Sequence, residues 1–412
     1  MEKRVVITGM GVVTSLGSDV DTFWNSIKEG KCGISLIEGF DTTDYACKIA
    51  AQVKDFDPSL YIDKKDAKRM DRTTQLAMAA TKMAVESSGF DYKNTDAYKF
   101  GVIMGTGIGG IETFENQHET LLNKGPKRVS PFYIPMMIAN MTVGRICMQY
   151  GAKGYNNCSV TACASGTNAI GDAFRVIQRG TCDVMIAGGS EATVTPMCIA
   201  GFCSMGAMSE AVDPLDASKP FDANRNGFIM GEGAGVLILE ELNHAVNRGA
   251  TIFAEVVGYG STNDAFHITA PDAEAEGGAA CMRLAIDDAG IDASQVDYIN
   301  AHGTSTGMND KLETLAIKKA LKDHAYKVAI SSTKSMTGHL LGAAGGVEAI
   351  ITALAVRDNF IPPTINYKDK DPECDLDYVP NKGRKADLTY AISNSLGFGG
   401  HNACIAIKKY IK

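Results

Sequence analysis

Four side chains of this sequence have the types needed for acyl transfer through a covalent intermediate. They are, in chain order, Cys163, His302, Lys334 and His339. A thiolate can attack a thioester and leave again, imidazoles can move protons or stabilise an oxyanion, and an ammonium group supplies positive charge. The chain therefore contains the parts of a cysteine-based acyltransferase, provided that its fold brings these far-apart residues together.

Cys163 stands in a small-residue stretch, 159–166, that is typical of a strand end, a turn and the start of a helix. Beyond it, apolar residues recur at the i, i+3, i+4, i+7 spacing of one helix face: Ile170, Ala173, Phe174 and Ile177. Unpaired backbone N–H groups and the helix dipole at such a start favour a thiolate over a thiol. The alternative is a buried cysteine that packs as a small hydrophobe. The stretch alone leaves both interpretations open.

The histidines, the lysine and a glycine loop follow predicted strands of the second half of the chain. These strands are 296–300 before His302, 328–330 before Lys334 and His339, and 390–393 before the loop 397–400. Active-site residues of α/β proteins gather at such strand ends. A helix is predicted after His302, with Asp310 as its N-cap and Glu313 completing a capping box. Each residue alone also fits a structural role, whereas the joint pattern favours an enzyme.

Composition bounds the class of protein. The chain has 412 residues, 45% of them hydrophobic, with a formal net charge of −8 and eleven cysteines. The negative charge disfavours a general nucleic-acid binder, and the unpaired spacing of the cysteines disfavours a disulfide framework or zinc site and indicates a reducing cytoplasm. The N-terminus passes directly into a strand-like segment with no room for a signal peptide, and no apolar run is long enough to insert in a membrane.

Two charged or glycine-rich motifs need separate interpretation. The segment 105–110 formally matches G-x-G-x-x-G, but no acidic residue ends a following strand, so we expect a turn against which another segment packs rather than a nucleotide site. A helix is predicted from Asp63 to about Gly89, with basic residues on one side: Lys64, Lys65, Lys68, Arg69 and Arg72. This face is either simply solvated or attracts an acidic partner.

The pattern of strands and amphipathic helices restarts after Glu241. The strand-like segment 253–257 runs into Gly258-Tyr259-Gly260, which resembles the segment from Val5 to Gly11. Strands alternating with helices in both parts predict two α/β halves of related topology, 1–250 and 251–412, that share one interface.

Four motifs together resemble those of the β-ketoacyl-[acyl-carrier-protein] synthases, the condensing enzymes of fatty-acid synthesis. They are Thr161-Ala162-Cys163-Ala164-Ser165-Gly166, Asn300-Ala301-His302-Gly303-Thr304-Ser305-Thr306, Lys334-Ser335-Met336-Thr337-Gly338-His339 and Gly397-Phe398-Gly399-Gly400. The resemblance spans essentially the whole chain. Relatives that start from acyl-CoA typically have asparagine at the second histidine, so His339, together with Ile108 and the length, favours the elongating type II group.

This resemblance implies a fold, a reaction and partners. The fold would be the five-layered αβαβα thiolase-like fold of two related halves, working as a homodimer. Cys163 would accept an acyl chain from the phosphopantetheine arm of acyl carrier protein, with no other cofactor required. His302 and His339 would promote decarboxylation of malonyl carrier protein, and the resulting carbanion would attack the Cys163 thioester. The basic helix face would then bind acyl carrier protein.

The resemblance also assigns supporting roles. Backbone N–H groups of Cys163 and Phe398 would form the oxyanion hole, Phe398 would gate the acyl pocket, and Lys334 and Glu313 would support His302. Substrate would contact Ile108, Thr304, Thr306 and Gly399. Some relatives hold a monovalent cation, Na⁺ or K⁺, at positions that correspond to Asn300, Glu348, Ser393 and Asn394.

Two departures from the family pattern lie at active-site loops. Gly307 stands where relatives commonly have proline, and Leu396 stands where phenylalanine is usual. Both bear on loop gating and chain-length preference more than on the reaction. Two other functions remain: a ketosynthase of a specialised polyketide-type pathway, or a non-catalytic partner subunit that shapes chain length. Subunits of the second kind usually lack the cysteine, so Cys163 counts against it.

Overall fold

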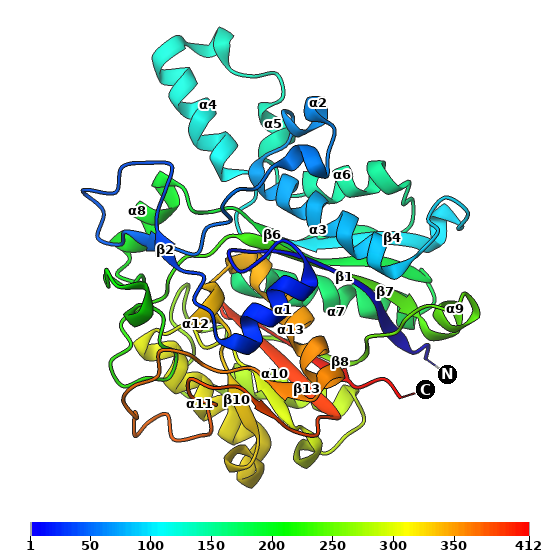
Figure 1. Cartoon of the computed structure of the whole chain (residues 1–412), viewed down its shortest axis with the longest axis vertical. Coiled ribbons are helices and arrows are strands. Elements are labelled where there is room, and N and C mark those ends of the chain that lie inside the picture. Colours follow the sequence, from blue (N-terminus) through cyan, green and yellow to red (C-terminus); the bar gives the residue numbers. More distant parts are fainter. Residues whose placement is uncertain (1, 412) are drawn as a thin grey trace.

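Ten strands form the framework of the molecule. The computed structural model, which describes residues 2–411, joins them into one mixed sheet (Figure 1). The strands of the first half are β1 (Val5–Val13), β4 (Phe100–Gly105), β5 (Asn156–Ser159), β6 (Val184–Glu191) and β7 (Gly233–Glu241). Those of the second are β8 (Ala254–Asn263), β9 (Tyr298–Asn300), β10 (Ala329–Ser331), β13 (Tyr390–Gly397) and β14 (His401–Lys408). Two small ribbons pair β2 (Ser35–Leu36) with β3 (Ile49–Ala50) and β11 (Phe360–Ile361) with β12 (Arg384–Lys385).

The two halves of the sheet have the same topology. The order β5-β4-β6-β7-β1 is third, second, fourth, fifth, first within its half, and β10-β9-β13-β14-β8 repeats that order. The pairings match as well: the first three strands of each run are parallel and the last two pair antiparallel. Strands β1 and β8 join the halves over three residue pairs. The predicted pair of related α/β halves is therefore confirmed.

Equivalent glycines explain why the segment 253–260 resembles the segment from Val5 to Gly11. A Cβ on Gly9 or Gly11 of β1 would lie 2.2 or 1.9 Å from a backbone oxygen of α3 (Arg72–Ser88). A Cβ on Gly258 or Gly260 of β8 would lie 2.1 Å from a backbone oxygen of α10 (Glu276–Asp288). Each first strand thus needs glycines because an outer helix lies directly on its backbone. The glycines continue the strand in both halves, where the sequence predicted that the strand would end.

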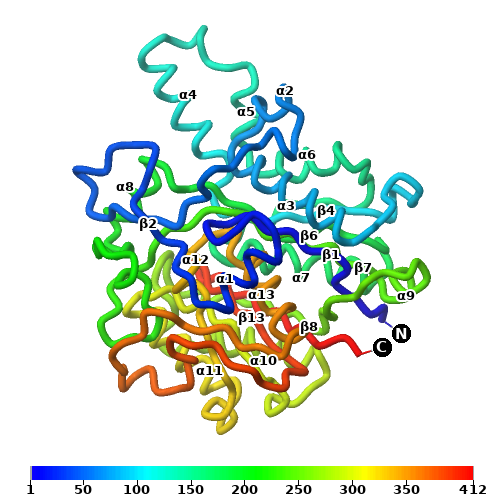
Figure 2. Tube along the Cα trace, in the orientation of Figure 1, coloured from blue at the N-terminus to red at the C-terminus, as the bar shows by residue number. Residues whose placement is uncertain are grey.

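Helices complete five layers. The central layer is α7 (Ser165–Gln178) with α13 (Ala344–Asp358), which share one apolar core with the inner faces of both half-sheets (Figure 2). One outer layer is α3 with α6 (Met141–Tyr150), and the other is α10 with α11 (Gly307–Leu321). All residues of α13 up to Val356 are buried, including Glu348 and Thr352, so this stretch has no solvent-facing side. The predicted αβαβα arrangement is confirmed.

Small residues let the two central helices meet at backbone distance. A Cβ on Gly166 of α7 would lie 2.8 Å from the backbone nitrogen of Gly346 in α13. A Cβ on Gly345 would lie 2.3 Å from the nitrogen of Thr167. We call this contact, made by Gly166, Thr167, Gly345 and Gly346, the glycine seam. It fixes how closely the two halves approach each other.

Two local predictions were wrong. The helix expected over 63–89 is interrupted: α2 (Lys64–Ala67) ends early and α3 restarts at Arg72, because Asp71 caps α3 by accepting from the Thr73 N–H. The predicted capping box after His302 is absent from the described residues. Thr306 caps α11 instead, so that both carboxylates of the supposed box face neighbouring loops.

The remaining helices lie around this body. They are α1 (Val20–Glu29), α4 (Ile111–Lys124), α5 (Tyr133–Met137), α8 (Pro196–Ser204), α9 (Leu242–Asn247) and α12 (Lys334–Thr337). Figure 1 shows α4 projecting from the body, and the α4–α5 region exposes several large apolar side chains: Phe114, Leu121, Leu122, Ile134 and Ile138. Within residues 2–411, no helix combines the length and apolar character needed to cross a membrane.

Candidate active site

The turn between β5 and α7 presents Cys163 to a cavity. After β5 the chain makes a short 3₁₀ turn, Ala162–Ala164, that leads into α7. Ala162 has φ = 51°, in the left-handed region that costs a non-glycine residue about 1 kcal/mol or more. The Ser165 hydroxyl holds the turn, because it accepts from the Thr161 N–H at 2.8 Å and donates to the Ala162 carbonyl at 2.6 Å. The strained residue thus precedes the sulfur and aims it outward.

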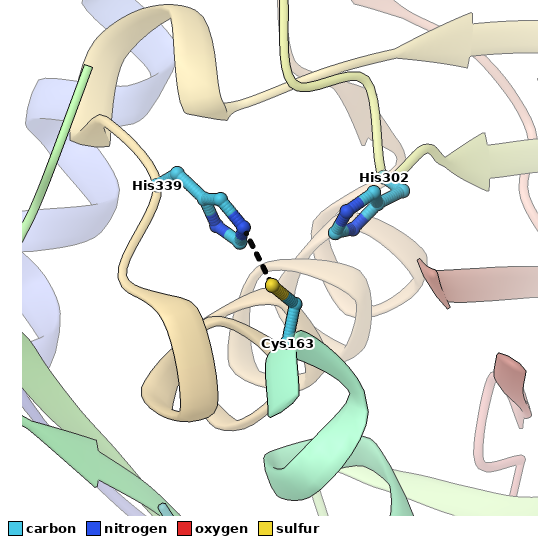
Figure 3. Close-up of side chains that lie close together, drawn as sticks. All are labelled: Cys163, His302 and His339. Atoms are coloured by element: carbon cyan, nitrogen blue, oxygen red, sulfur yellow. Dashed lines mark hydrogen bonds between the residues drawn. The ribbon is translucent and has the colours of Figure 1, made fainter. Parts of the chain in front are cut away.

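Three far-apart segments meet at this sulfur. Nε2 of His339 lies 3.1 Å from Sγ of Cys163, and the rings of His302 and His339 stand nearly perpendicular with centroids 5.2 Å apart. Figure 3 shows both rings directed toward the sulfur. One ligand-type atom from each residue lies within 4.8 Å of the others, and within residues 2–411 this is the only such group of three histidine, cysteine or acidic side chains. The structure thus brings together the cysteine and both histidines.

Burial is the largest influence on the charge state of Cys163. Loss of water around the sulfur raises the pKa of the Cys163 thiol to about 12, although the nearby Lys334 charge and a hydrogen bond from the Phe398 backbone oppose this increase. The sequence left a thiolate and a buried thiol open, and the raised pKa favours a neutral thiol in the free site. Burial likewise lowers the pKa of His302 and of His339 well below the usual 6.5, so both rings are neutral at pH 7.

The tautomers of the two histidines follow from unpartnered atoms. Within the described residues, Nδ1 of His302 and Nδ1 of His339 are buried and have no hydrogen-bond partner. A proton on either Nδ1 would be a buried, unsatisfied donor, which costs more than an unused lone pair. We infer that each ring carries its proton on Nε2. Since both residues line the cavity, it is supplied with two neutral N–H donors.

Lys334 and Glu313 act on the histidines by different routes. The Lys334 ammonium is buried in α12 and forms an ion pair with Glu348 of α13. Its charge is one of the causes that lower the pKa of both imidazoles. The Glu313 carboxylate does not touch the His302 ring. It accepts from the backbone N–H groups of His302 at 2.8 Å and Gly303 at 2.7 Å, and so holds the loop that carries the ring.

The cavity at Cys163 has a volume of about 560 Å³ and is lined by both halves of the chain. Its walls include four residues that the sequence assigned to substrate or gating: Ile108, Thr304, Thr306 and Phe398. The Thr304 and Thr306 hydroxyls lie 3.0 Å apart. Gly399 is absent from this lining among the described residues, and its N–H donates to the Ile268 carbonyl at 2.8 Å. Gly399 therefore anchors the loop behind Phe398.

The predicted basic face divides into free and engaged side chains. Lys64, Lys65 and Lys68 are exposed. The Arg69 guanidinium lies over the Phe132 ring at 4.4 Å. Arg72 is not available to a partner, because its guanidinium donates to Glu232 and to the Val53 carbonyl, each at 2.8 Å. The sequence could not show this, since Glu232 lies 160 positions away.

The four predicted cation ligands lie on two faces of the sheet. Asn300 and Ser393 are register neighbours on β9 and β13, and this register faces α13, which carries Glu348. Within residues 2–411, Asn300 Oδ1, Ser393 Oγ and Glu348 Oε2 are buried without partners. Such orphaned oxygens are the ligands that hard cations take. Asn394 Oδ1 is likewise buried without a partner within residues 2–411, but its amide nitrogen contacts Met282 and Glu313, which places this side chain on the opposite face of the sheet.

Sequence reasoning missed Glu191, a fully buried carboxylate at the end of β6 beside the cavity. Its hydrogen bonds go to the glycine turn 105–110 and to Gly342. The turn was expected to have another segment packed against it, and the start of α7 packs on Gly105, residues 136–139 pack on Gly109 and Gly110, and the Glu191 carboxylate lies against Gly107. The available signal was a charged residue closing an otherwise apolar strand, because buried carboxylates are rare without a dedicated set of donors.

Comparison with known proteins gives full-length matches. Residues 2–245 match the family described as "Beta-ketoacyl synthase, N-terminal domain", and residues 253–368 match "Beta-ketoacyl synthase, C-terminal domain". A protein of Synechocystis sp. named "3-oxoacyl-[acyl-carrier-protein] synthase 2" is 53% identical over 410 residues, which cover 99% of each chain. A protein of the same name from Staphylococcus aureus is 52% identical over 408 residues, again 99% of each chain.

Solved structures with the same fold include ketosynthases. The structure described as "The ishigamide ketosynthase/chain length factor" is 36% identical, with a TM-score of 0.94 over 100% of both chains. A type II polyketide ketosynthase solved in complex with its acyl-carrier protein is 35% identical, with a TM-score of 0.91 over 100% of both chains.

Proposed function

This chain belongs to the beta-ketoacyl synthase family, and we propose that it is an elongating condensing enzyme with the Cys163 cavity as its active site. It joins a Cys163-bound acyl chain to malonyl-[acyl-carrier protein] and gives 3-oxoacyl-[acyl-carrier protein] plus CO₂. The observation that carries the proposal is one sulfur in contact with the His339 imidazole and within 4.8 Å of the His302 imidazole, all three lining one cavity. All eleven cysteines are free thiols, which fits work in the reducing cytoplasm.

Acyl transfer needs a nucleophile that can also leave. The Cys163 sulfur attacks the thioester carbonyl of the incoming acyl chain, and its proton ends on the departing pantetheine sulfur, so that one thioester replaces another. The negative charge that develops on the carbonyl oxygen is stabilised by the backbone N–H groups of Cys163 and Phe398. A neutral resting thiol suits this step, because a buried thiolate without substrate would be open to oxidation.

Condensation starts with loss of the malonyl carboxylate. The C–C bond to that carboxylate breaks, CO₂ leaves, and the electron pair moves toward the malonyl thioester oxygen as an enolate. The Nε2–H donors of His302 and His339 stabilise this oxygen. C2 then attacks the Cys163 thioester, the new C–C bond forms, and the Cys163 sulfur departs and recovers a proton. Because both rings are neutral, this step needs no titration near pH 7.

A specialised polyketide ketosynthase is the second candidate. The solved ketosynthases of that kind are 35–36% identical, whereas the relatives named 3-oxoacyl-[acyl-carrier-protein] synthase 2 are 52–53% identical over the full length. This difference favours fatty-acid elongation. A non-catalytic chain-length subunit is disfavoured, since Cys163 lies in contact with His339.

A condensation assay tests the proposed function. Purified enzyme is supplied with malonyl carrier protein and saturated acyl carrier proteins of increasing length. We expect a 3-oxoacyl product two carbons longer than the primer and one CO₂ for each condensation. Several saturated primers of different length should be accepted. Release of CO₂ without chain extension, or extension only of 3-oxoacyl starters, would contradict the assignment to fatty-acid elongation.

We further propose that an acidic acyl carrier protein docks at the face formed by Lys64, Lys65 and Lys68. These ammonium groups are exposed in a chain whose net charge is −8, so they form a local positive patch that can steer an acidic partner. Arg69 lies beside them and stacks on Phe132. Arg72 belongs to the fold rather than to this face.

We propose a homodimer that forms through the edge of β5. The opposite edge of the sheet, β10, is covered because the Ile330 N–H donates to the Asp377 carbonyl. Within residues 2–411, no strand covers the outer edge of β5, and such open edges favour pairing with another chain. The exposed apolar residues of the α4–α5 region supply additional surface to bury. Sedimentation at micromolar concentration should give twice the chain mass, and a monomer would contradict the proposal.

We propose a monovalent cation at Asn300, Ser393 and Glu348. Their orphaned oxygens fit Na⁺ or K⁺, and the Lys334–Glu348 pair leaves Glu348 Oε2 free to contribute. The thermal unfolding midpoint should rise with K⁺ or Na⁺ relative to a bulky organic cation at equal ionic strength, and Ser393→Ala should reduce this increase. Equal midpoints in all three salts would exclude a bound ion that stabilises the fold.

A further inference from the structure

Glu191 contacts two loops of the active site that come from different halves of the chain. One loop, 106–108, carries Ile108 in the cavity wall, and the other, 339–342, begins with His339. We propose that Glu191 is a positioning residue that fixes where the acyl-pocket wall at Ile108 lies relative to the His339 turn. This inference rests on the proposed function, since it concerns how the same site places its acyl chain and its second imidazole.

The carboxylate is used by backbone and hydroxyl donors alone. Oε1 accepts from the Thr106 hydroxyl at 2.8 Å and from the Ile108 N–H at 3.3 Å. Oε2 accepts from the Gly107 N–H at 2.6 Å and from the Gly342 N–H at 2.9 Å. Oε2 therefore joins the two loops through one atom, while Oε1 fixes the residue whose side chain lines the cavity.

No side chain can replace this link by packing. A Cβ on Gly107 would lie 2.9 Å from Glu191 Oε2, and a Cβ on Gly342 would lie 2.2 Å from the Gly107 nitrogen. The two loops therefore meet at backbone distance around the carboxylate. A movement of either loop breaks a bond to the same group, so the position of Ile108 and the position of His339 depend on each other.

A second buried glutamate shows what a purely structural role looks like. Glu240 on β7 is equally buried, but its carboxylate bonds to Arg248, His244 and Thr8, so its charge is balanced within the fold. It pairs with Val184 at the start of β6, whereas Glu191 is the last residue of that strand. The two carboxylates are thus separated by roughly 20 Å along the strand. Glu240 provides a matched control.

The test compares Glu191→Gln with Glu240→Gln in the full-length enzyme. The amide keeps the shape of the side chain but has one acceptor atom, so it cannot serve all four donors. Two readouts are taken, each divided by the concentration of folded enzyme. They are the rate of malonyl decarboxylation and kcat/KM across acyl carrier proteins of increasing length. Thermal unfolding measures the general cost of changing a buried glutamate.

We expect Glu191→Gln to reduce decarboxylation by about tenfold or more and to change the chain-length profile in the same variant, because small misplacements of reacting groups cost up to two orders of magnitude. Glu240→Gln should lower the unfolding midpoint while leaving both readouts within about twofold of wild type. Thr106→Val removes the hydroxyl that donates to Glu191 and accepts from the Gly109 N–H, both on the Ile108 side, so it should change the chain-length profile more than the decarboxylation rate.

Two results would overturn the inference. One is a Glu191→Gln enzyme whose chain-length profile and decarboxylation rate change no more than those of Glu240→Gln. The other is a uniform decrease for all acyl lengths in proportion to the fraction unfolded, which a structural role alone would cause. Failure of the proposed function is a distinct outcome, because the wild-type enzyme would then make no condensation product in the same assay.

Discussion

The two halves of the molecule share one strand order yet deliver different chemistry to the same cavity. In each half the third strand leads into a buried central helix: β5 into α7 and β10, by way of α12, into α13. Cys163 stands before the first of these helices and His339 before the second. The repeated topology makes Cys163 the middle residue of the 3₁₀ turn before α7 and Gly342 the middle residue of the 3₁₀ turn before α13. His339 lies three residues before Gly342, and its Nε2 meets the sulfur at 3.1 Å.

The comparison extends to the loops after the second strands. The loop after β4 donates backbone N–H groups to Glu191, and the loop after β9 donates backbone N–H groups to Glu313. Each half therefore uses a buried carboxylate to hold one loop, but the first loop carries the apolar Ile108 and the second carries His302. In the proposed function, the first half supplies the nucleophile and the part of the wall that includes Ile108, and the second half supplies the imidazoles.

Removal of the sulfur tests the first half most severely. Cys163→Ala should reduce condensation by roughly four orders of magnitude or more, as expected when a covalent nucleophile is lost. Mass spectrometry should find no acyl-enzyme. Retained condensation in this variant would break the division of labour between the halves.

Replacing each imidazole in turn distinguishes the roles of the two histidines within the second half. His302→Ala should leave acylation of Cys163 largely intact and lower malonyl decarboxylation by about 10²- to 10³-fold, because one of two enolate donors is gone. His339→Ala should slow both steps, since its Nε2 also contacts the sulfur. Rapid-mixing assays of each half-reaction separate these outcomes, and equal defects in the two variants would contradict the assigned roles.

The Lys334–Glu348 ion pair tests whether the second half depends on a buried charge. Lys334→Met leaves Glu348 unpaired in the core and should lower the free energy of unfolding by about 3–5 kcal/mol. The double variant with Glu348→Gln should recover most of that loss. Denaturant titration of both variants measures the difference, and a double variant no more stable than Lys334→Met would show that packing rather than charge is responsible.

Glu313 predicts a pH dependence with a definite sign. Burial raises the pKa of this carboxyl to about 7 from its usual 4.5, so the folded chain holds the proton more tightly than the unfolded chain. Its contribution to stability is complete below pH 4.5 and is lost as the pH rises through 7, on the order of 3 kcal/mol in all. Glu313→Gln cannot titrate, so its stability should fall less over this range. Parallel curves for the two proteins would refute the assignment.

The basic face should give the smallest effect. Lys68→Ala should raise KM for acyl carrier protein about two- to threefold at low salt and less at high salt, because exposed charges contribute weakly and are screened. The rate with free acyl-pantetheine should not change. Arg72→Ala is the contrast: its loss should lower stability, since it removes the ion pair with Glu232.

The sequence predicted the strands, the two halves and the meeting of three motifs, because these depend on local periodicity and on residues at strand ends. It failed where partners are distant in the chain. In the sequence Arg72 was grouped with the other basic residues of the face, but in the fold it pairs with Glu232. Glu313 was predicted to be part of a capping box, but it accepts a hydrogen bond from the loop of His302. The sequence left the charge state of Cys163 open for a related reason, since burial is a property of the assembled cavity and not of the turn.

The glycine seam holds the starts of α7 and α13 at main-chain distance, directly after the turns that carry Cys163 and follow His339. The Cβ of any larger residue at Gly166 would lie within 3 Å of α13, and at Gly345 within 3 Å of α7. Side-chain repacking elsewhere cannot widen this joint, so the outer layers are free to vary while the reacting atoms keep their spacing. A single added methyl group at the seam, at the second residue of α7 or of α13, would act as a wedge between the two active-site turns without touching a reacting atom.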